Sequence, residues 1–355
     1  MTFLDIWEQP VITEFIRRRH EDIRKAAGGE EEFGKNIADT ILPTVPHNGR
    51  YAKIRVQDVV PTGMAPFKAP GASPMLWTRK PQLREEVIEL VDIDEFHRVD
   101  PIDMLQLQSP DPRAQAETAW TIADRGADMQ DRNELRTLWM KWEALKGTLV
   151  VNYPNAASQT IDYGIPVGHF TTFGTPWTDT ANADIVEQLW ALGSIGLSDA
   201  GVYLPKYHFN SSTWRYMRRN ELIRDQLSSY GRNVFLPTEN DLRDLLREGT
   251  QFVIVDDGYL PEGATDFNLT KWIGDGKILA TTADYKYAGR RIGEMLDGWV
   301  LVGPPGSAAN LPVAKQGMQS EWIYERKEQQ TLLRQVSARI PRIVAPNAIA
   351  WATAY

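Results

Sequence analysis

Hydrophobic positions near the start of the chain follow a helical spacing. Apolar side chains recur every three or four residues between Pro10 and Gly28, at Val11, Ile12, Phe15, Ile16 and Ile23. This pattern predicts a helix with a narrow apolar face, which needs a partner to cover it. Acidic residues alternate with the arginines of this segment, which favours a solvated outer face over a nucleic-acid site. We interpret residues 1–46 as an arm.

Two alternating segments, residues 51–56 and 87–91, predict strands. The stretch between them is broken by prolines and glycines, at Pro61, Gly63, Pro66, Pro70, Gly71 and Pro74. Two strands joined by so long a tip form a loop that is marginally stable alone in water. A loop of this length inside a compact domain favours a functional arm that another surface covers.

The longest helical pattern begins at Asp111-Pro112 and ends before Gly147. Aspartate is a favourable N-cap, proline suits the first helical position and glycine suits the stop. The span is about 34 residues, or about 50 Å if the helix continues through Gly126. One face of its second half is apolar, at Leu135, Leu138, Trp139, Trp142 and Leu145. We expect a long, half-buried spine helix.

The remaining pattern mixes strands and helices. Strands are expected at residues 148–153, 161–173 and 251–255, and helices at 184–192 and at 210–230. Thr238-Glu239-Asn240-Asp241 has the spacing of a capping box and predicts a helix that ends by Gly249. Asp275-Gly276 predicts a two-residue hairpin turn between strands at 271–273 and 278–280. The chain from Glu321 onward is strand-like, so the expected class is α+β.

Composition narrows the function. The chain of 355 residues has a net charge of −8 and no cysteine. The lack of cysteine excludes disulfide scaffolds, thiolate metal sites and a Cys nucleophile. The acidic balance argues against a protein that grips phosphate over a large surface. No apolar run approaches the roughly 18 residues of a membrane span, and Asp5 and Glu8 stand where a secretory signal would be basic. We therefore expect neither membrane insertion nor export by that route.

Catalytic motifs are absent from the sequence. There is no HExxH, GxSxG or GxGxxG, and Gly276-Lys277 is followed by Ile278 where a phosphate loop needs Ser or Thr. The five histidines have no ligand spacing: His20, His47, His97, His169 and His208. We expect no enzymatic activity, no catalytic residue, no cofactor and no metal.

Adjacent carboxylates offer one enzymatic alternative. Asp256 and Asp257 follow an apolar strand, as metal-binding carboxylates do in some phosphoryl-transfer enzymes. Asp-Gly after a strand is also ordinary turn chemistry, which we favour here and for the group Asp92, Asp94 and Glu95. A metal-dependent hydrolase that uses Asp256 or Asp257 is the remote alternative.

The order of these elements, together with several short segments, resembles a known family. The segments are Ile273-Gly274-Asp275-Gly276-Lys277-Ile278-Leu279, Ser320-Glu321-Trp322-Ile323-Tyr324-Glu325-Arg326, Arg339-Ile340-Pro341, Ala345-Pro346-Asn347-Ala348-Ile349 and the helix exit over residues 131–147. In this order they resemble the tailed-phage major capsid proteins of the Hong Kong 97 type fold, and most closely the lambda-type major capsid protein E family. The resemblance covers nearly the whole chain.

The resemblance implies a Hong Kong 97-like α+β fold with named parts. Residues 1–47 would be the N-terminal arm and 48–98 the extended two-stranded E-loop. Residues 99–180 would be the P-domain with the spine helix, to which residues 321–355 return as C-terminal strands, and 181–320 would be the α/β A-domain.

The function implied is that of a major capsid protein, a virion shell subunit that self-assembles into an icosahedral capsid around double-stranded DNA. Hexamers and pentamers of the chain itself would form the shell, with no sequence-specific DNA binding and with assembly in the host cytoplasm. The implied partners are a separate scaffolding protein, a portal and a possible decoration protein. An encapsulin-like compartment, which shares the fold, is the nearer alternative, and no covalent crosslink is expected.

Apolar residues in the arm and the loop have no core of their own. We expect them to be sheltered by neighbouring subunits. The candidates for such contacts are Phe3, Ile6, Trp7, Met64, Phe67, Met75, Leu76 and Trp77.

Overall fold

The computed structural model describes residues 9–26, 36–57, 83–153, 157–231, 235–264, 266, 268–287, 289–302, 313–325 and 330–355. Helices and strands are interleaved along the chain, so the expected mixed class is confirmed. The chain forms two compact units. Unit 1 comprises Met1–Lys53, Val87–Lys141 and Glu294–Arg342, and unit 2 comprises Ile54–Glu86, Trp142–Gly293 and Ile343–Tyr355.

The predicted spine helix is present as α5 (Pro112–Leu145), an unbroken run of 34 residues. A carboxylate oxygen of Asp111 accepts a hydrogen bond from the Arg113 N–H at 2.9 Å, which is the expected N-cap contact. The chain leaves the helix at Gly147, whose φ of 100° favours glycine. Local signals therefore fix both ends of α5. The division between the two units falls within this helix, after Lys141.

The sheet of unit 1 is built on β19 (Gln330–Ile343), a strand of 14 residues. β4 (Val91–Val99) and β18 (Gln319–Glu325) both pair with β19 in antiparallel fashion. β15 (Gly293–Asp297) also neighbours β19, and β1 (Thr44–Pro46) pairs with β15 in parallel. The length of β19 lets segments far apart in the sequence share one sheet.

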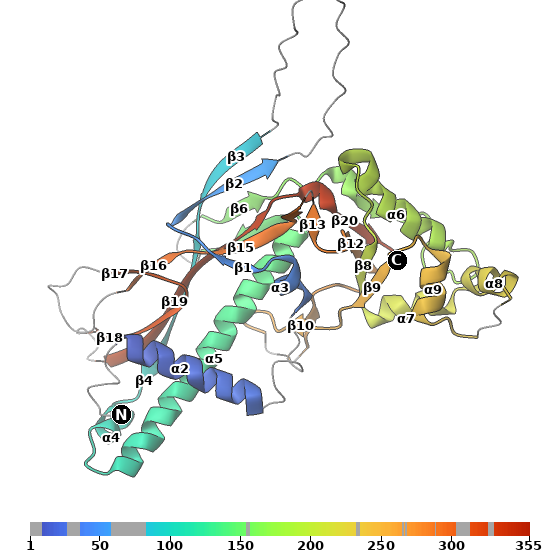
Figure 1. Cartoon of the computed structure of the whole chain (residues 1–355). Helices are drawn as coiled ribbons and strands as arrows, with labels where there is room; N and C mark the ends of the chain where they lie inside the picture. Colours follow the sequence, from blue (N-terminus) through green and yellow to red (C-terminus); the bar gives the residue numbers. More distant parts are fainter. Residues whose placement is uncertain are drawn as a thin grey trace, which may run out of the picture. The chain divides into compact units, whose positions relative to one another are not determined.

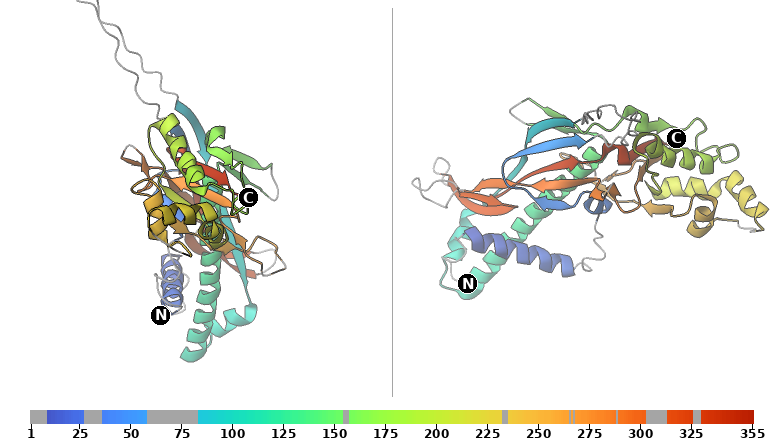
Figure 2. Two further views of the ribbon diagram at one scale, coloured as in Figure 1. Left: turned by 90° about the vertical axis from the view of Figure 1, so that its right-hand side faces the viewer. Right: turned by 45° about the horizontal axis from the view of Figure 1, so that its top comes forward.

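Helix α2 (Gln9–Ala26) is the predicted N-terminal helix, and it lies across α5 (Figures 1 and 2). Ile16 of α2 packs directly over Gly126, where a Cβ atom would lie only 2.6 Å from the Ile16 side chain. The Thr13 hydroxyl donates to the Ser320 carbonyl of β18 at 3.1 Å. Gly126 therefore does not break α5 but permits the close approach of α2.

The sheet of unit 2 has the order β7-β20-β12-β8-β9. Its strands are β7 (Phe170–Thr172), β8 (Lys206–Phe209), β9 (Gln251–Ile254), β12 (Lys277–Thr281) and β20 (Ile349–Thr353). β12 is antiparallel to both of its neighbours, whereas the β20–β7 and β8–β9 pairs are parallel. The strand β20 thus occupies an interior position of the sheet.

In unit 2 this sheet is accompanied by the helices α6 (Ile185–Ala200), α7 (Ser211–Arg219), α8 (Glu221–Ser229) and α9 (Glu239–Leu245) (Figure 1). They share one hydrophobic core with the strands, in which Leu189, Tyr207 and Ile278 are buried. The predicted capping box of α9 is confirmed, because the side chains of Thr238 and Asp241 each bond the other's backbone N–H.

The prediction of one continuous helix over residues 210–230 is wrong, because the structure has two helices there. The segment is divided into α7 and α8 at Asn220, whose backbone leaves the helical region with ψ of 132°. The Asn220 side chain accepts from the Ile223 N–H at 2.9 Å and donates to the Ala183 carbonyl at 2.7 Å. Asparagine competes with the helix for backbone hydrogen bonds, so Asn220 starts a new helix instead of continuing the old one.

The predicted hairpin around Asp275-Gly276 is also wrong. The turn exists, with the Lys277 N–H bonded to the Gly274 carbonyl at 3.1 Å, but the flanking strands do not pair with each other. β11 (Thr270–Lys271) pairs with β10 (Gly258–Tyr259), and both edges of β12 are occupied by β20 and β8. Non-local pairing of a buried strand overrides the local turn signal.

The predicted strand pair at the base of the long loop is present, as β2 (Tyr51–Gln57) paired with β3 (Leu83–Glu89). The remaining short elements are α3 (Ile37–Ile41), α4 (Pro101–Leu107), β5 (Thr148–Val151), β6 (Gln159–Asp162), β13 (Lys286–Tyr287), β14 (Arg290–Arg291), β16 (Trp299–Val302), β17 (Val313–Gln316) and the single turns η1 (Val167–His169) and η2 (Pro346–Ala348). None of the described helices combines the length and the apolar content needed to cross a bilayer.

Candidate functional site

The eight contact candidates taken from the sequence lie outside the described residues. They belong to residues 1–8 and 58–82, and they are Phe3, Ile6, Trp7, Met64, Phe67, Met75, Leu76 and Trp77. Their role as contacts between subunits therefore stays a prediction.

The described residues add exposed apolar side chains that the sequence-based prediction missed. Ile102 and Leu105 are exposed on one face of α4, and Arg125 of α5 holds this helix through an ion pair with Asp103 at 2.9 Å. Phe235, four residues before α9, is 82% exposed. Tyr230, directly after α8, is 76% exposed. Exposed apolar side chains that share one helix face, as Ile102 and Leu105 do in α4, are typical of interaction surfaces. The i,i+3 spacing in α4 was the available signal in the sequence.

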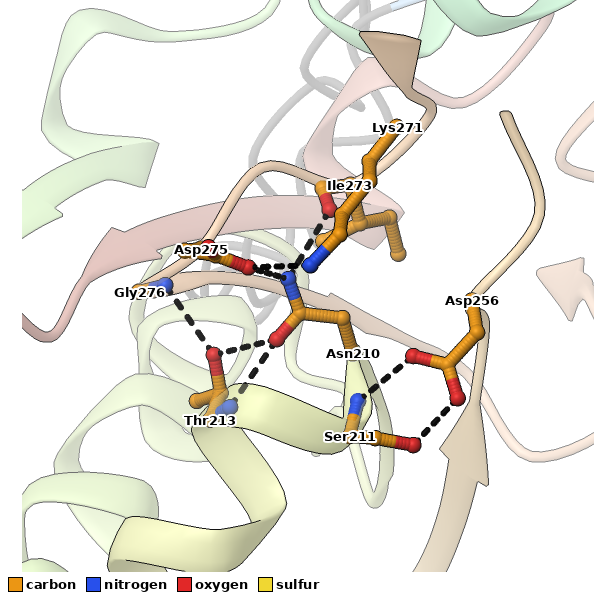
Figure 3. A network of polar contacts seen from close by, with 8 residues as sticks. All are labelled: Asn210, Ser211, Thr213, Asp256, Lys271, Ile273, Asp275 and Gly276. Atoms are coloured by element: carbon orange, nitrogen blue, oxygen red, sulfur yellow. Dashed lines mark hydrogen bonds and ion pairs between the residues drawn. The ribbon is translucent and has the colours of Figure 1, made fainter. Parts of the chain in front are cut away.

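The candidate catalytic carboxylate Asp256 is engaged at the start of a helix (Figure 3). It accepts hydrogen bonds from the Ser211 N–H, at 2.7 Å, and from the Ser211 hydroxyl, at the first residue of α7. A carboxylate is stabilising at this place because the unpaired N–H groups and the helix dipole are positive there. The arrangement fits a structural role better than a metal-ligand role.

The same end of α7 is held from a second side by Asn210 (Figure 3). The Asn210 carbonyl oxygen accepts from the Thr213 N–H at 2.9 Å, and its amide donates to the Ile273 carbonyl and to Asp275. Asp275 also pairs with Lys271 at 2.7 Å, and this hydrogen bond lowers the pKa of the Asp275 carboxyl group. The network ties α7 to the turn before β12.

Asp256→Asn is expected to lower the free energy of unfolding by about 1 kcal/mol, because it removes a charge that stabilises the start of α7. Melting temperatures with and without Mg²⁺ measure the effect. Wild-type protein should melt at the same temperature in both conditions. A Mg²⁺-dependent stabilisation that Asp256→Asn abolishes would favour the hydrolase alternative instead.

The other suspected acidic group is divided among three arginines. Asp92 pairs with Arg50, Asp94 with Arg334, and Glu95 with Arg132, each at 2.5 Å. Burial raises the pKa of Asp92, and Arg50 opposes that shift. The turn expected for this group is wrong, because all three residues lie within the strand β4, and their carboxylates bind protein cations in structural ion pairs.

Two of the histidines are buried in structural contacts. His169 contacts the Ile349 carbonyl at 2.7 Å through Nδ1 and Asp199 at 2.9 Å through Nε2. His208 contacts the Thr281 hydroxyl at 3.1 Å, and burial lowers its pKa to about 3, so its ring is neutral. A third, His20, lies near Asp131 and Glu134, residues that no sequence spacing connects to it.

Unit 2 also contains a cavity of about 370 Å³ beside β20. Its apolar wall includes Phe170, Trp272 and Trp351, and three lysines line it as well. These lysines have protein partners: Lys146 pairs with Glu143, Lys271 with Asp275, and Lys277 with the Thr353 hydroxyl. The cavity therefore presents apolar surface, and its three lysines are bound to other protein groups.

Comparison with known proteins begins with families. A model described as phage major capsid protein E matches residues 37–297. No curated protein is similar enough in sequence to count as a match.

Among solved structures, a phage-related protein from Bordetella bronchiseptica RB50 is 11% identical with a TM-score of 0.52, over 97% of this chain and 96% of that chain. A protein of Escherichia coli CFT073, assigned as a prophage capsid protein, is 12% identical with a TM-score of 0.57, over 97% of this chain and 99% of that one. At these identities the likeness establishes the fold alone.

The family match covers well over half of the chain, and the mixed fold agrees with it. The sequence-based resemblance is thereby confirmed: the chain belongs to the phage major capsid protein E family.

Proposed function

We propose that this chain is the subunit of an icosahedral shell, built from its own hexamers and pentamers, that encloses phage double-stranded DNA. The observation that carries the proposal is the family match over residues 37–297. The family makes the chain a major capsid protein and a component of the virion. The fold shared with the prophage capsid protein at a TM-score of 0.57 supports the same function.

We further propose the Hong Kong 97-like arrangement of parts: an arm at 1–47, an E-loop at 48–98, a P-domain at 99–180 completed by 321–355, and an A-domain at 181–320. The long helix α5 and the paired strands β2 and β3 support this assignment. The two compact units do not follow these boundaries throughout, since residues 142–180 and 343–355 of the proposed P-domain belong to unit 2.

Interfaces between copies would do the work of such a shell. The exposed apolar residues of α4 and of the segment between α8 and α9 support this view, since burying apolar surface yields about 25 cal/mol per Å². Head-to-tail contacts that use two different surfaces close into rings. We assign Ile102, Leu105, Tyr230 and Phe235 as contact residues, in addition to the eight candidates in the arm and loop.

The partners follow from the same proposal. We expect a separate scaffolding protein, a portal and a possible decoration protein, with assembly in the host cytoplasm. The net charge of −8 would let packaged DNA slide along the inner surface, since a basic surface would hold it. DNA would be enclosed without sequence recognition.

An encapsulin-like compartment is the second candidate. Terminase and portal genes beside the coding sequence would distinguish a phage capsid from a compartment.

The test removes residues 58–82 and joins β2 to β3 by a short Gly-Ser turn, which leaves both strands in place. Full-length protein expressed with its scaffold is expected to form shells visible by electron microscopy, and the shortened protein is expected to stay in small oligomers. Removing all of residues 48–98 would be a poorer test, because it deletes β4 and its pairing with β19. Full-length protein that stays monomeric with its scaffold would refute the proposal.

A single substitution sharpens the test. Trp77→Ala is expected to reduce the yield of shells with little change in the melting temperature of the subunit. Trp177→Ala is the matched control, because Trp177 is fully buried and stacks on Phe173, so assembly and melting temperature should fall together. An equal fall of both quantities in Trp77→Ala would show that Trp77 serves the fold and not an interface.

A further inference from the structure

The N-terminal helix and the spine helix bring three potential metal ligands together in unit 1. His20 of α2, with Asp131 and Glu134 of α5, offers one donor atom each within 4.8 Å of one another. Among the residues that the structure describes, no other group of three such side chains is found. His20 lies 111 positions from Asp131 in the sequence, so only the fold creates the group.

Packing fixes the histidine in this position. The side chain of His20 is only 4% exposed, and its Nε2 lies 2.6 Å from a carboxylate oxygen of Asp131. Ile16, one helical turn earlier, rests on Gly126, so α2 approaches α5 more closely than a residue with a Cβ would allow. A buried imidazole held by two packed helices is a pre-positioned ligand.

The carboxylates have the spacing of a chelating pair. Asp131 and Glu134 stand three residues apart on α5, which places them on one face of the helix. The Asp131 side chain is 53% exposed, so it can turn toward an ion. Gln130 donates to one oxygen of Glu134 at 3.1 Å.

We propose that His20, Asp131 and Glu134 form a binding site for a divalent transition metal such as Zn²⁺. One imidazole nitrogen and two carboxylate oxygens are a ligand set that Zn²⁺ accepts, with water in the open position. Ligand atoms about 2.0–2.2 Å from Zn²⁺ lie about 3.3–3.6 Å apart in a tetrahedron. The His20–Asp131 contact, at 2.6 Å, must therefore widen by about 0.7–1.0 Å, which the exposed Asp131 side chain allows. The metal would replace the direct contact between these two groups.

Binding would fasten α2 to α5 and so stabilise the N-terminal helix against the sheet of unit 1. This consequence does not depend on the capsid function, because it concerns a single chain. It follows from preferential binding to the folded state.

The test measures Zn²⁺ binding to the purified full chain by calorimetry, with hydrogen exchange of residues 9–26 as a second readout. Wild-type protein is expected to bind one ion per chain and to gain protection in α2. His20→Gln and Asp131→Asn are expected to weaken binding by about tenfold or more. Asp124→Asn is the matched control, since it breaks the Arg19–Asp124 ion pair between the same helices but leaves the site intact.

Three results would overturn the proposal: no stoichiometric binding by the wild type, equal binding by wild type and Asp131→Asn, or loss of binding in Asp124→Asn as well. If His20→Gln alters the fold by circular dichroism, the exposed Asp131 provides the deciding variant. Loss of binding in Asp124→Asn as well would show that helix docking, and not ligation, controls the ion.

Discussion

Arg334→Ala is expected to lower the free energy of unfolding by about 3–5 kcal/mol. Arg334 of β19 binds Asp94 of β4 through two hydrogen bonds, at 2.8 and 2.5 Å, and Glu321 of β18 through one at 2.6 Å. The hydrogen bond with Asp94 raises the pKa of Arg334, so it stays charged. The side chain of Glu321 is only 2% exposed, so removal of Arg334 takes an ion-pair partner away from a buried carboxylate. Chemical denaturation of the subunit measures the loss.

A paired substitution separates the buried charge from the lost packing. Arg334→Ala combined with Glu321→Leu is expected to recover most of the lost stability, because the buried carboxylate that Arg334 pairs with is gone. Arg132→Ala is the control, since it removes an exposed partner of Glu95 and should cost no more than about 1 kcal/mol. A double variant as unstable as the sum of both single changes would contradict the argument.

Asp39→Ala is expected to cost about 3 kcal/mol, more than Lys141→Met. Lys141 of α5 is 2% exposed, and its Nζ donates to Asp39 at 2.6 Å and to the Thr44 hydroxyl at 3.3 Å. Asp39 is 48% exposed, so water can solvate its carboxylate when Lys141 is replaced. Removing Asp39 instead leaves a buried ammonium without its counter-ion. Denaturant midpoints of the two variants test the order.

The pH dependence of the unfolding free energy tests the same explanation for Asp39→Ala. Burial lowers the pKa of Lys141, and Asp39 opposes the shift, so the pKa should fall further in Asp39→Ala. A lysine with a lowered pKa in the folded state binds fewer protons there than in the unfolded chain, so stability rises with pH above the folded pKa. The difference in unfolding free energy between Asp39→Ala and wild type should therefore narrow as the pH rises toward the ordinary lysine pKa of about 10.4. A constant difference would show that the ammonium charge is not the cause.

Features set by neighbouring residues could be predicted from the sequence. Asp111, Pro112 and Gly147 are local signals, and they fixed the ends of α5 correctly. The capping box at Thr238 and Asp241 was equally local. Such signals act within a turn of the chain, where sequence distance and spatial distance agree.

Features set by distant partners could not be predicted in this way. The hairpin expected at Asp275-Gly276 failed because β12 is paired on both sides by strands far away in the sequence. The same holds for the candidate sites. Arg334 and Asp94 are 240 positions apart, and His20 and Asp131 are 111 apart. The spacing of hydrophobic residues along the sequence therefore does not indicate either contact.

The interior position of β20 has a consequence for synthesis. β7 has β20 as its partner in the sheet, and β12 needs β20 along one edge, yet residues 349–353 are made long after both. Until these residues are synthesised, the edges of β7 and β12 that pair with β20 have unpaired backbone N–H and C=O groups. Such unpaired edges can form hydrogen bonds with other chains. Nascent or prematurely terminated copies therefore carry a tendency to aggregate that finished copies lose.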